Sequence, residues 1–150
     1  MDGPLLTDDF KEFLKLFNAH RVEYLVVGGY AVGVHGYPRA TVDLDVWVRS
    51  SPDNAARIVA ALHAFGFAAT APDPSLFLSD RTIVRFGVPP FRIELMTSID
   101  GVMFDACAQR ALVMEIDGTS VPFISLEDLR ANKRAAGRHK DLNDLENLPS

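Results

Sequence analysis

The chain has 150 residues, 48% of them hydrophobic and 23% charged, a balance typical of a folded domain and unlike that of a disordered chain. Its 15 Lys and Arg against 20 Asp and Glu give a formal net charge of −5, which excludes nonspecific attraction of the whole molecule to nucleic acid. One cysteine and four widely spaced histidines exclude a disulfide scaffold and a zinc finger.

No segment is typical of a membrane span, a secretion signal or a linker. The longest run without a charged or strongly polar residue, 24–34, has eleven residues, about half of what a bilayer-spanning helix needs. The N-terminus is acidic where a signal peptide would be basic. We therefore expect a single domain over residues 1–150, located in the cytoplasm and without membrane contact.

The N-terminal segment predicts a helix, a strand and a tight turn into a second helix. Thr7 is a helix cap, and the residues after it place four apolar side chains on one helical face: Phe10, Phe13, Leu14 and Phe17. The run 22–28 is rich in β-branched residues and ends in two glycines, which predicts a strand followed by a turn. Residues 30–35 then fit a helix that begins where the strand stops.

Residues 41–48 alternate between apolar and polar side chains, which predicts a strand. Its apolar face consists of Val42, Leu44, Val46 and Val48. The opposite face carries Asp43 and Asp45, whose Cα atoms would lie roughly 6.5 to 7 Å apart. Two carboxylates at this spacing can bind one cation together or bracket two.

The middle of the chain predicts one helix and two strands. Ser51 and Gly66 are the start and stop signals of the helix. Residues 81–88 and 91–97 are β-rich runs separated by glycine and proline, which predicts two strands. The later strand alternates so that Glu94 faces away from the core.

The C-terminal part predicts a hairpin and two helices. Two strands, 112–116 and 119–124, flank an Asp-Gly pair that is typical of a type I′ turn. A helix then runs from a capping box at Ser125 to Gly137. A last helix covers about 140–148 and stops before a proline.

Three of these features together indicate phosphate and metal chemistry. The pair Gly28-Gly29 at a strand-to-helix turn lets a ligand approach the backbone amides closely, which is a common anion site. Mg²⁺ prefers oxygen ligands and is usually held by one or two carboxylates together with substrate phosphates. Two such ions stabilise in-line displacement at phosphorus. Asp43, Asp45 and a third carboxylate, Glu94, would complete such a site.

These motifs match the signature of a known superfamily in the same order. They are Val27-Gly28-Gly29, Asp43-Leu44-Asp45 and Ile93-Glu94-Leu95. They resemble the DNA polymerase beta-like nucleotidyltransferases, whose signature is a hydrophobic residue before Gly-Gly or Gly-Ser, an Asp-hydrophobic-acid motif, and a later acid between hydrophobics. The segment 125–148 is similar to small stand-alone bacterial and archaeal members, including relatives of abortive-infection and type IV toxin nucleotidyltransferases.

The resemblance implies a fold and a reaction. The fold is an α/β (α+β) nucleotidyltransferase fold, a mixed and largely antiparallel sheet with helices packed on one face. The reaction moves a nucleoside monophosphate from an NTP to an acceptor hydroxyl and releases pyrophosphate. Asp43 and Asp45 would hold two Mg²⁺ ions, and Glu94 would complete the metal nearer the acceptor and help to deprotonate its hydroxyl. Two departures stand out: Gly29 replaces the Ser of many members, and Glu94 replaces the commoner Asp.

Several residues are predicted to contact the nucleotide: Gly28, Gly29, Arg39, Thr41, Lys133 and Lys140. If the chain is extended after Pro38, Arg39 and Thr41 continue the face of the two aspartates. Lys133 and Lys140 belong to a basic cluster, and the resemblance aligns a family Lys with Lys133 and a family Asp with Asp141 or Asp144. Two alternatives stay open: Arg39 is a solvated loop arginine, or the cluster only favours a helix C-terminus.

Other residues have simpler interpretations. The two aspartates alone would also suit a solvated sheet face. The glycine pair alone would suit a dinucleotide-binding turn, but the G-x-G-x-x-G pattern is absent. His35 is expected to end a helix rather than act as a ligand or base. Trp47 is expected to cover the sheet rather than stack on a nucleobase, and Cys107 to lie in the core.

The acceptor is left open by these residues. Candidates are a small molecule such as an aminoglycoside, a partner protein, or tRNA, and the family relatives suggest a toxin–antitoxin pair. We expect no stable binding to duplex DNA, and either a homodimer or a small helical partner protein. The alternative function is a catalytically inactive nucleotide-binding regulator or antitoxin subunit that acts through a protein partner.

Overall fold

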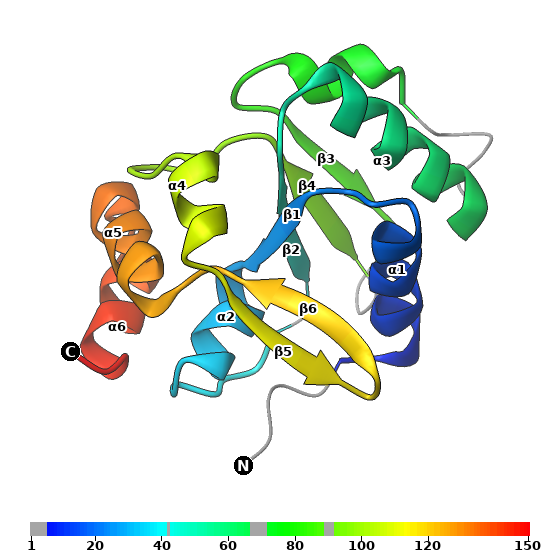
Figure 1. Cartoon of the computed structure of the whole chain (residues 1–150). Helices are drawn as coiled ribbons and strands as arrows, with labels where there is room; N and C mark the ends of the chain where they lie inside the picture. The colour runs from blue at the N-terminus through cyan, green and yellow to red at the C-terminus, as the bar shows by residue number, and fades with distance from the viewer. Residues whose placement is uncertain (1–5, 42, 67–71, 89–91) are drawn as a thin grey trace.

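The computed structural model describes residues 6–41, 43–66, 72–88 and 92–150. Its centre is a six-stranded mixed sheet in the order β3-β4-β2-β1-β6-β5 (Figure 1). The strands are β1 (Tyr24–Val27), β2 (Leu44–Val48), β3 (Ile83–Phe86), β4 (Ile93–Met96), β5 (Leu112–Ile116) and β6 (Thr119–Phe123). The helices are α1 (Asp8–Ala19), α2 (Gly28–Val34), α3 (Pro52–Phe65), the short 3-10 helix η1 (Pro74–Leu78), α4 (Phe104–Gln109), α5 (Leu126–Ala136) and α6 (His139–Asn147).

Strand pairing brings the three predicted motifs together. β2 lies between β1, which is antiparallel to it, and β4, which is parallel. Asp45 is the register partner of Val27 on one side and of Glu94 on the other. At the flanks, β3 and β5 are antiparallel to β4 and β6, and β6 is parallel to β1. The sheet is therefore mixed with mostly antiparallel pairs, as predicted.

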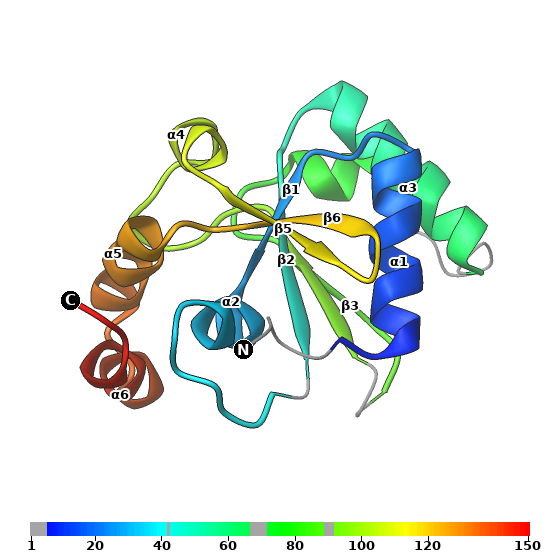
Figure 2. The ribbon, with the colours of Figure 1, turned by 60° about the horizontal axis from the view of Figure 1, so that its bottom comes forward.

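The core lies between the sheet and the helices α1 and α3. Leu44, Val46 and Phe10 are fully buried, and Phe13 of α1 packs edge-on against Phe65 of α3 with ring centroids 5.3 Å apart. Figures 1 and 2 place α1 and α3 on one side of the sheet and α5 and α6 on the other. The predicted helical layer is present, and α5 and α6 lie on the side that carries the acids.

The helix ends follow the capping signals of the sequence. The hydroxyl of Thr7 accepts a hydrogen bond from Phe10 N–H at 3.2 Å, and Ser125 caps the first turn of α5 in the same way. Gly66 and Gly137 end α3 and α5 in the left-handed conformation that glycine tolerates. Among the described residues, no helix combines the length and apolar character that crossing a membrane requires.

Most strands are shorter than the sequence predicted, whereas β5 has the predicted bounds 112–116. Asp43 precedes β2 instead of lying in it, and the regular pairing begins at Leu44, whose N–H donates to the carbonyl of Arg92 at 3.0 Å. The helices η1 and α4 were not predicted, because they are too short to show an apolar periodicity. Val42 and Phe91, which we placed on the expected strands, lie outside the described residues.

Candidate active site

A cavity of about 620 Å³ opens where β1 ends and β2 and β4 begin. On the sheet side it is lined by Gly28, Gly29, Asp43, Asp45 and Glu94. On the helix side its lining comes from α5 and the start of α6: Asn132, Lys133, Arg138 and Lys140. The glycine turn and the three acids of the sequence motifs therefore share one cavity.

The glycine turn is packed too tightly for any side chain. Gly28 has a φ of +67°, and a Cβ at this position would overlap the carboxylate of Asp45. At Gly29 a Cβ would lie 2.6 Å from the hydroxyl oxygen of Thr41. Thr41 thus fills the space that the Ser of many superfamily members would need. The absence of side chains keeps the backbone of the turn directly beside Asp45.

Asp45 is a partly buried acid of the site whose pKa is raised. Burial raises its pKa to about 7, with smaller contributions from Glu94 and Asp43, whereas Lys140 opposes the shift. Its Oδ1 is buried and has no hydrogen-bond partner in the described part of the chain. A buried carboxylate oxygen without a partner is destabilising. A bound cation would both satisfy this oxygen and lower the pKa.

The other two acids are held by arginines that our sequence analysis did not single out. Arg92 binds Asp43 through two hydrogen bonds of 3.2 and 2.8 Å. The Nε of Arg85 donates to Glu94 at 2.6 Å, because Arg85 on β3 is the register partner of Glu94 on β4. The alternation of 91–97 places Arg92 on the face of Glu94, so that signal was available. The Arg85 contact depends on strand register, which the local sequence pattern does not specify.

The carboxylates fit a cation that is bound partly by its substrate. In the described residues, no group of three or more His, Cys, Asp or Glu is placed to hold a metal ion. Mg²⁺ commonly takes only one or two carboxylates and completes its shell with phosphate and water oxygens. The unpartnered oxygen of Asp45, with Asp43 and Glu94 beside it, is a donor set of this kind. It suits a metal–triphosphate complex better than a metal held by protein alone.

Residues 6–148 match the model of a protein family described as nucleotidyltransferases of unknown function, DUF6036. The chain belongs to this family. No curated protein matches the sequence. The match includes all three acids and the glycine turn, so the cavity described above lies in the region that defines the family.

Solved structures share the fold of this nucleotidyltransferase family member. A Thermotoga maritima protein assigned as a nucleotidyltransferase superposes with a TM-score of 0.64 at 16% identity, covering 91% of this chain and 88% of that one. The lincosamide antibiotic adenylyltransferase LnuA, solved with lincomycin bound, superposes with a TM-score of 0.56 at 13% identity, covering 95% of this chain and 96% of that one. An antigenic nucleotidyltransferase-like protein from Paracoccidioides brasiliensis superposes with a TM-score of 0.54 at 18% identity, covering 97% of this chain and 77% of that one. Likeness at these identities shows a common fold.

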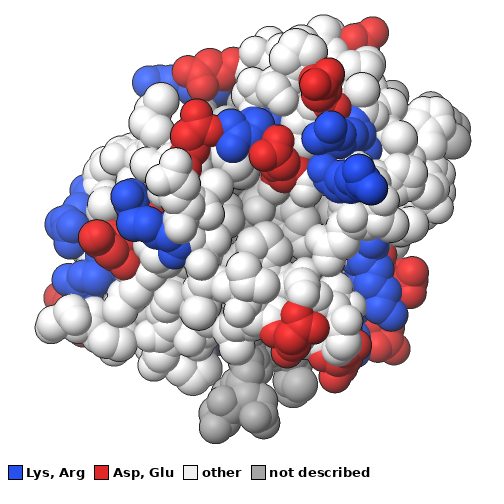
Figure 3. Space-filling view, viewed as in Figure 1, with Lys and Arg blue, Asp and Glu red and all other residues white. Residues whose placement is uncertain are grey.

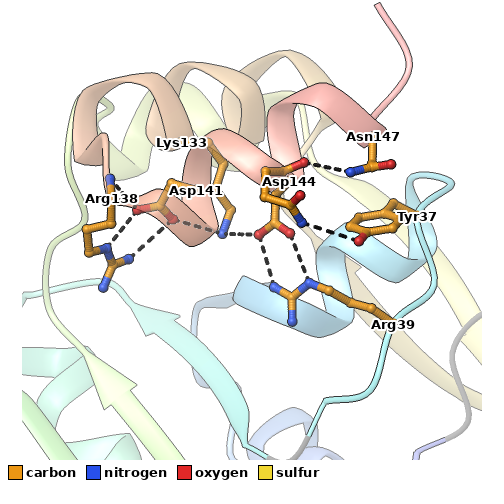
Figure 4. A network of polar contacts seen from close by, with 8 residues as sticks. Tyr37, Arg39, Lys133, Arg138, Asp141, Asp144 and Asn147 are labelled. Carbon is orange, nitrogen blue, oxygen red and sulfur yellow. Dashed lines mark hydrogen bonds and ion pairs between the residues drawn. The ribbon is translucent and has the colours of Figure 1, made fainter.

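The C-terminal helices contribute a buried ionic network to the cavity (Figure 4). The Nζ of Lys133, which is 4% exposed, lies 3.2 Å from an oxygen of Asp141 and 3.0 Å from an oxygen of Asp144. Arg39 binds Asp144 through hydrogen bonds of 2.9 and 3.0 Å, and Arg138 binds Asp141. Burial alone would raise the pKa of both aspartates, but these hydrogen bonds outweigh it and lower the pKa.

The predicted nucleotide-binding cations occupy different positions relative to this network. Arg39 and Lys133 belong to it and also line the cavity. The guanidinium of Arg39 is therefore held in place, rather than solvated in a loop. Lys140 lines the cavity without an ion pair to any described carboxylate. Thr41 packs against Gly29 and is outside the lining. Nucleotide contact by all four stays a prediction.

Trp47 and His35 take the simpler of their two expected roles. Trp47 is 2% exposed and its ring is covered edge-on by Phe104 of α4, with centroids 5.1 Å apart. A covered ring offers no face for stacking on a nucleobase. His35 is the C-cap of α2, and its Nε2 lies 2.7 Å from the carbonyl oxygen of Ile124. Cys107 is fully buried in the core.

Proposed function

We propose that the protein is a Mg²⁺-dependent nucleotidyltransferase that transfers a nucleoside monophosphate from an NTP to an acceptor hydroxyl. One observation carries the proposal: Asp45 lies between Gly28 and Glu94 and has a buried oxygen that no described residue satisfies. A metal-bound triphosphate supplies the missing cation and an anion for the glycine turn. Membership in a nucleotidyltransferase family supports the same class of reaction.

The acids would hold the metal and the remaining lining would hold the nucleotide. Asp43, Asp45 and Glu94 would be the ligands of two Mg²⁺ ions, which when bound would neutralise the triphosphate and stabilise charge on the leaving group. The backbone at Gly28 and Gly29 contacts phosphate. The cations on the helix side counter the charge of the departing pyrophosphate; they are Arg39, Lys133 and Lys140.

The transfer is an in-line displacement at the α-phosphorus. The acceptor oxygen forms a bond to this phosphorus while the bond to the bridging α–β oxygen breaks. The bridging oxygen leaves with the electron pair as part of pyrophosphate. The proton of the acceptor hydroxyl passes to the carboxylate of Glu94, which is 16% exposed in its side chain and can release the proton to water.

The test is calorimetric titration of the protein with ATP in the presence and absence of Mg²⁺. Asp45→Asn keeps the shape of the side chain and removes its charge. We expect ATP binding with Mg²⁺ to weaken by about tenfold or more, since interactions of buried charged groups contribute about 1.5 to 3 kcal/mol. Removal of Mg²⁺ from the parent should have a similar effect.

The matched control is Asp53→Asn, which removes an exposed acid from the first turn of α3, outside the cavity. This variant should bind ATP with Mg²⁺ as the parent does. Equal affinity of the parent and Asp45→Asn, or affinity independent of Mg²⁺, would contradict the proposed site.

The biological setting of the reaction is a separate hypothesis. The similarity to small toxin-type nucleotidyltransferases suggests a cytoplasmic protein with a protein or tRNA acceptor, and LnuA shows that the fold also occurs in an antibiotic adenylyltransferase. The pairing of Asp43 and Glu94 with arginines favours a second candidate, a nucleotide-binding regulator without turnover. Formation of pyrophosphate from ATP with any acceptor would exclude this second candidate.

A further inference from the structure

Three arginines form a basic wall on the side of the cavity opposite to the glycine turn. They are Arg81, Arg85 and Arg92, which lie before β3, on β3 and before β4. None is part of the superfamily motifs in the sequence, and none has a role in the function proposed above. We call this set of three residues the β3 wall.

Two arginines of the β3 wall share their partners with the proposed metal. Arg92 binds both oxygens of Asp43, and Arg85 binds Glu94. A carboxylate oxygen that ligates Mg²⁺ has less charge to offer a guanidinium. Binding of the metal would therefore weaken both ion pairs and leave two cationic side chains facing the cavity. The side chains of Arg85 and Arg92 are 56% and 36% exposed, so both can turn toward a ligand.

The third arginine already has no acidic partner. Arg81 forms no ion pair with a described carboxylate, although it lines the cavity. Its backbone is held at a φ of 56° and its N–H donates to the hydroxyl of Ser98 at 3.0 Å. A left-handed backbone is uncommon for a non-glycine residue. The chain thus fixes the position of this arginine at the rim while its charge stays uncompensated.

The position of the β3 wall indicates which substrate it meets. The sheet order places β1, with the glycine turn at its end, on one side of the acids and β3 on the other. In an in-line displacement the attacking and leaving oxygens are on opposite sides of the phosphorus. If the glycine turn and the α5–α6 cations hold the leaving pyrophosphate, the acceptor lies beside Glu94 and the β3 wall.

We propose that the β3 wall is an anion site for the acceptor, and that the acceptor is therefore a hydroxyl compound that carries a phosphate group. This proposal rests on the function proposed above. Guanidinium groups bind phosphate through paired hydrogen bonds. A polycationic acceptor, such as an aminoglycoside, would instead be disfavoured, because seven Lys and Arg line the cavity against four Asp and Glu. With Mg²⁺ bound to the acids, Arg85 and Arg92 would be released from Glu94 and Asp43 and could bind this phosphate group.

The test measures binding of ribose 5-phosphate, with ribose as its uncharged counterpart. The protein is first saturated with Mg²⁺ and α,β-methylene ATP, which fills the nucleotide site and cannot release pyrophosphate. Phosphorus NMR then follows ribose 5-phosphate, and proton NMR follows ribose. We expect ribose 5-phosphate to bind at least about tenfold more tightly than ribose, the difference expected of a charge-assisted contact. Equal affinity would overturn the proposal.

Variants locate the anion and separate this proposal from the function. Arg85→Gln with Arg92→Gln should weaken binding of ribose 5-phosphate by about tenfold and leave α,β-methylene ATP bound. The control Arg134→Gln changes an exposed arginine of α5 outside the cavity and should have no effect. If the double variant loses the nucleotide but not ribose 5-phosphate, the arginines serve the triphosphate and the proposal is wrong. If the parent fails to bind the nucleotide with Mg²⁺, the proposed function falls first.

Release of the arginines can be tested without metal. Glu94→Gln removes the charge that holds Arg85, so the metal-free variant should bind ribose 5-phosphate several-fold more tightly than the metal-free parent. The same substitution should weaken the Mg²⁺–nucleotide complex. An unchanged affinity for ribose 5-phosphate would overturn the release of Arg85, and binding of kanamycin in preference to ribose 5-phosphate would overturn the acceptor class.

Discussion

At the scale of single residues, Asp45 couples the site to pH. Burial, reinforced by Glu94 and Asp43, raises its pKa from the ordinary value of 3.8 to about 7. The folded protein therefore holds this proton more tightly than the unfolded chain does. The contribution of Asp45 to the free energy of unfolding is complete below the unfolded pKa and is lost as the pH rises toward 7. Binding of a cation has the opposite dependence, because it needs the deprotonated carboxylate.

We predict that the metal-free parent loses stability between about pH 4 and about pH 7, by at most about 1.4 kcal/mol per pH unit from this group. The free energy of unfolding of Asp45→Asn should depend less on pH over the same range, and the variant should be more stable than the parent near neutral pH. Urea unfolding of both proteins across this range is the measurement. Parallel pH profiles of parent and variant would show that Asp45 is not the group that titrates.

At the scale of elements, the helices α5 and α6 are joined by charge as well as by packing. Lys133 on α5 is the common partner of Asp141 and Asp144, which are each 1% exposed. Through Asp144 the network reaches Arg39, in the segment between α2 and β2. Removing one partner from a buried network of one cation and two carboxylates is strongly destabilising, because the remaining charges lose their compensation.

Lys133→Met should lower the free energy of unfolding by about 3 to 5 kcal/mol, because it leaves the buried aspartates short of one cation. Lys140→Met is the matched control: Lys140 lines the same cavity, is exposed, and pairs with no described carboxylate, so its loss should change stability by less than about 0.5 kcal/mol. Chemical denaturation measures both. Similar stability of the two variants would mean that the network does not hold α5 and α6 together.

The same elements show what the sequence could predict and what it could not. Local signals were sufficient for the helix caps and for the hairpin turn, where Asp117 and Gly118 have φ of 50° and 81° as a type I′ turn requires. The motif order was sufficient to bring Asp45 and Glu94 into one cavity, because a family pattern encodes strand neighbours that propensity does not. The pair of Arg85 with Glu94 was missed, since it depends on a register that only the folded sheet fixes.

The C-terminal ionic network could be predicted from the sequence only in part. Asp141 and Asp144 are three residues apart on a predicted helix, so the sequence places them on one face. Nothing in that spacing indicates that the face is buried against Lys133 and Arg39, because charged residues are usually exposed. The burial of this network follows from the packing of α5 against α6, which is a tertiary property.

At the scale of the whole molecule, cations are concentrated in the cavity of an acidic protein. The chain carries a formal charge of −5, yet seven Lys and Arg line the cavity beside four Asp and Glu. On the face shown in Figure 3, positive and negative side chains lie next to one another around an uncharged centre, without a broad patch of one sign. Such a distribution favours a compact anion that enters the cavity over a long polyanion that lies across a surface.

We therefore predict that the protein does not form a stable complex with duplex DNA at about 0.15 M salt. A duplex binder neutralises many phosphates at once, and its affinity falls steeply with salt. Of the seven cations that line the cavity, only Arg81 and Lys140 lie outside ion pairs with described carboxylates. A short single-stranded RNA that enters the cavity by one end should bind with an affinity that falls only slowly with salt. The logarithm of its binding constant should fall with the logarithm of the salt concentration by a slope of about 0.7 per contacted phosphate. Fluorescence anisotropy with labelled duplex DNA and labelled RNA over a series of salt concentrations is the measurement. Saturable binding of the duplex with a steep salt dependence would place a nucleic-acid track on the surface and contradict a cavity-limited anion site.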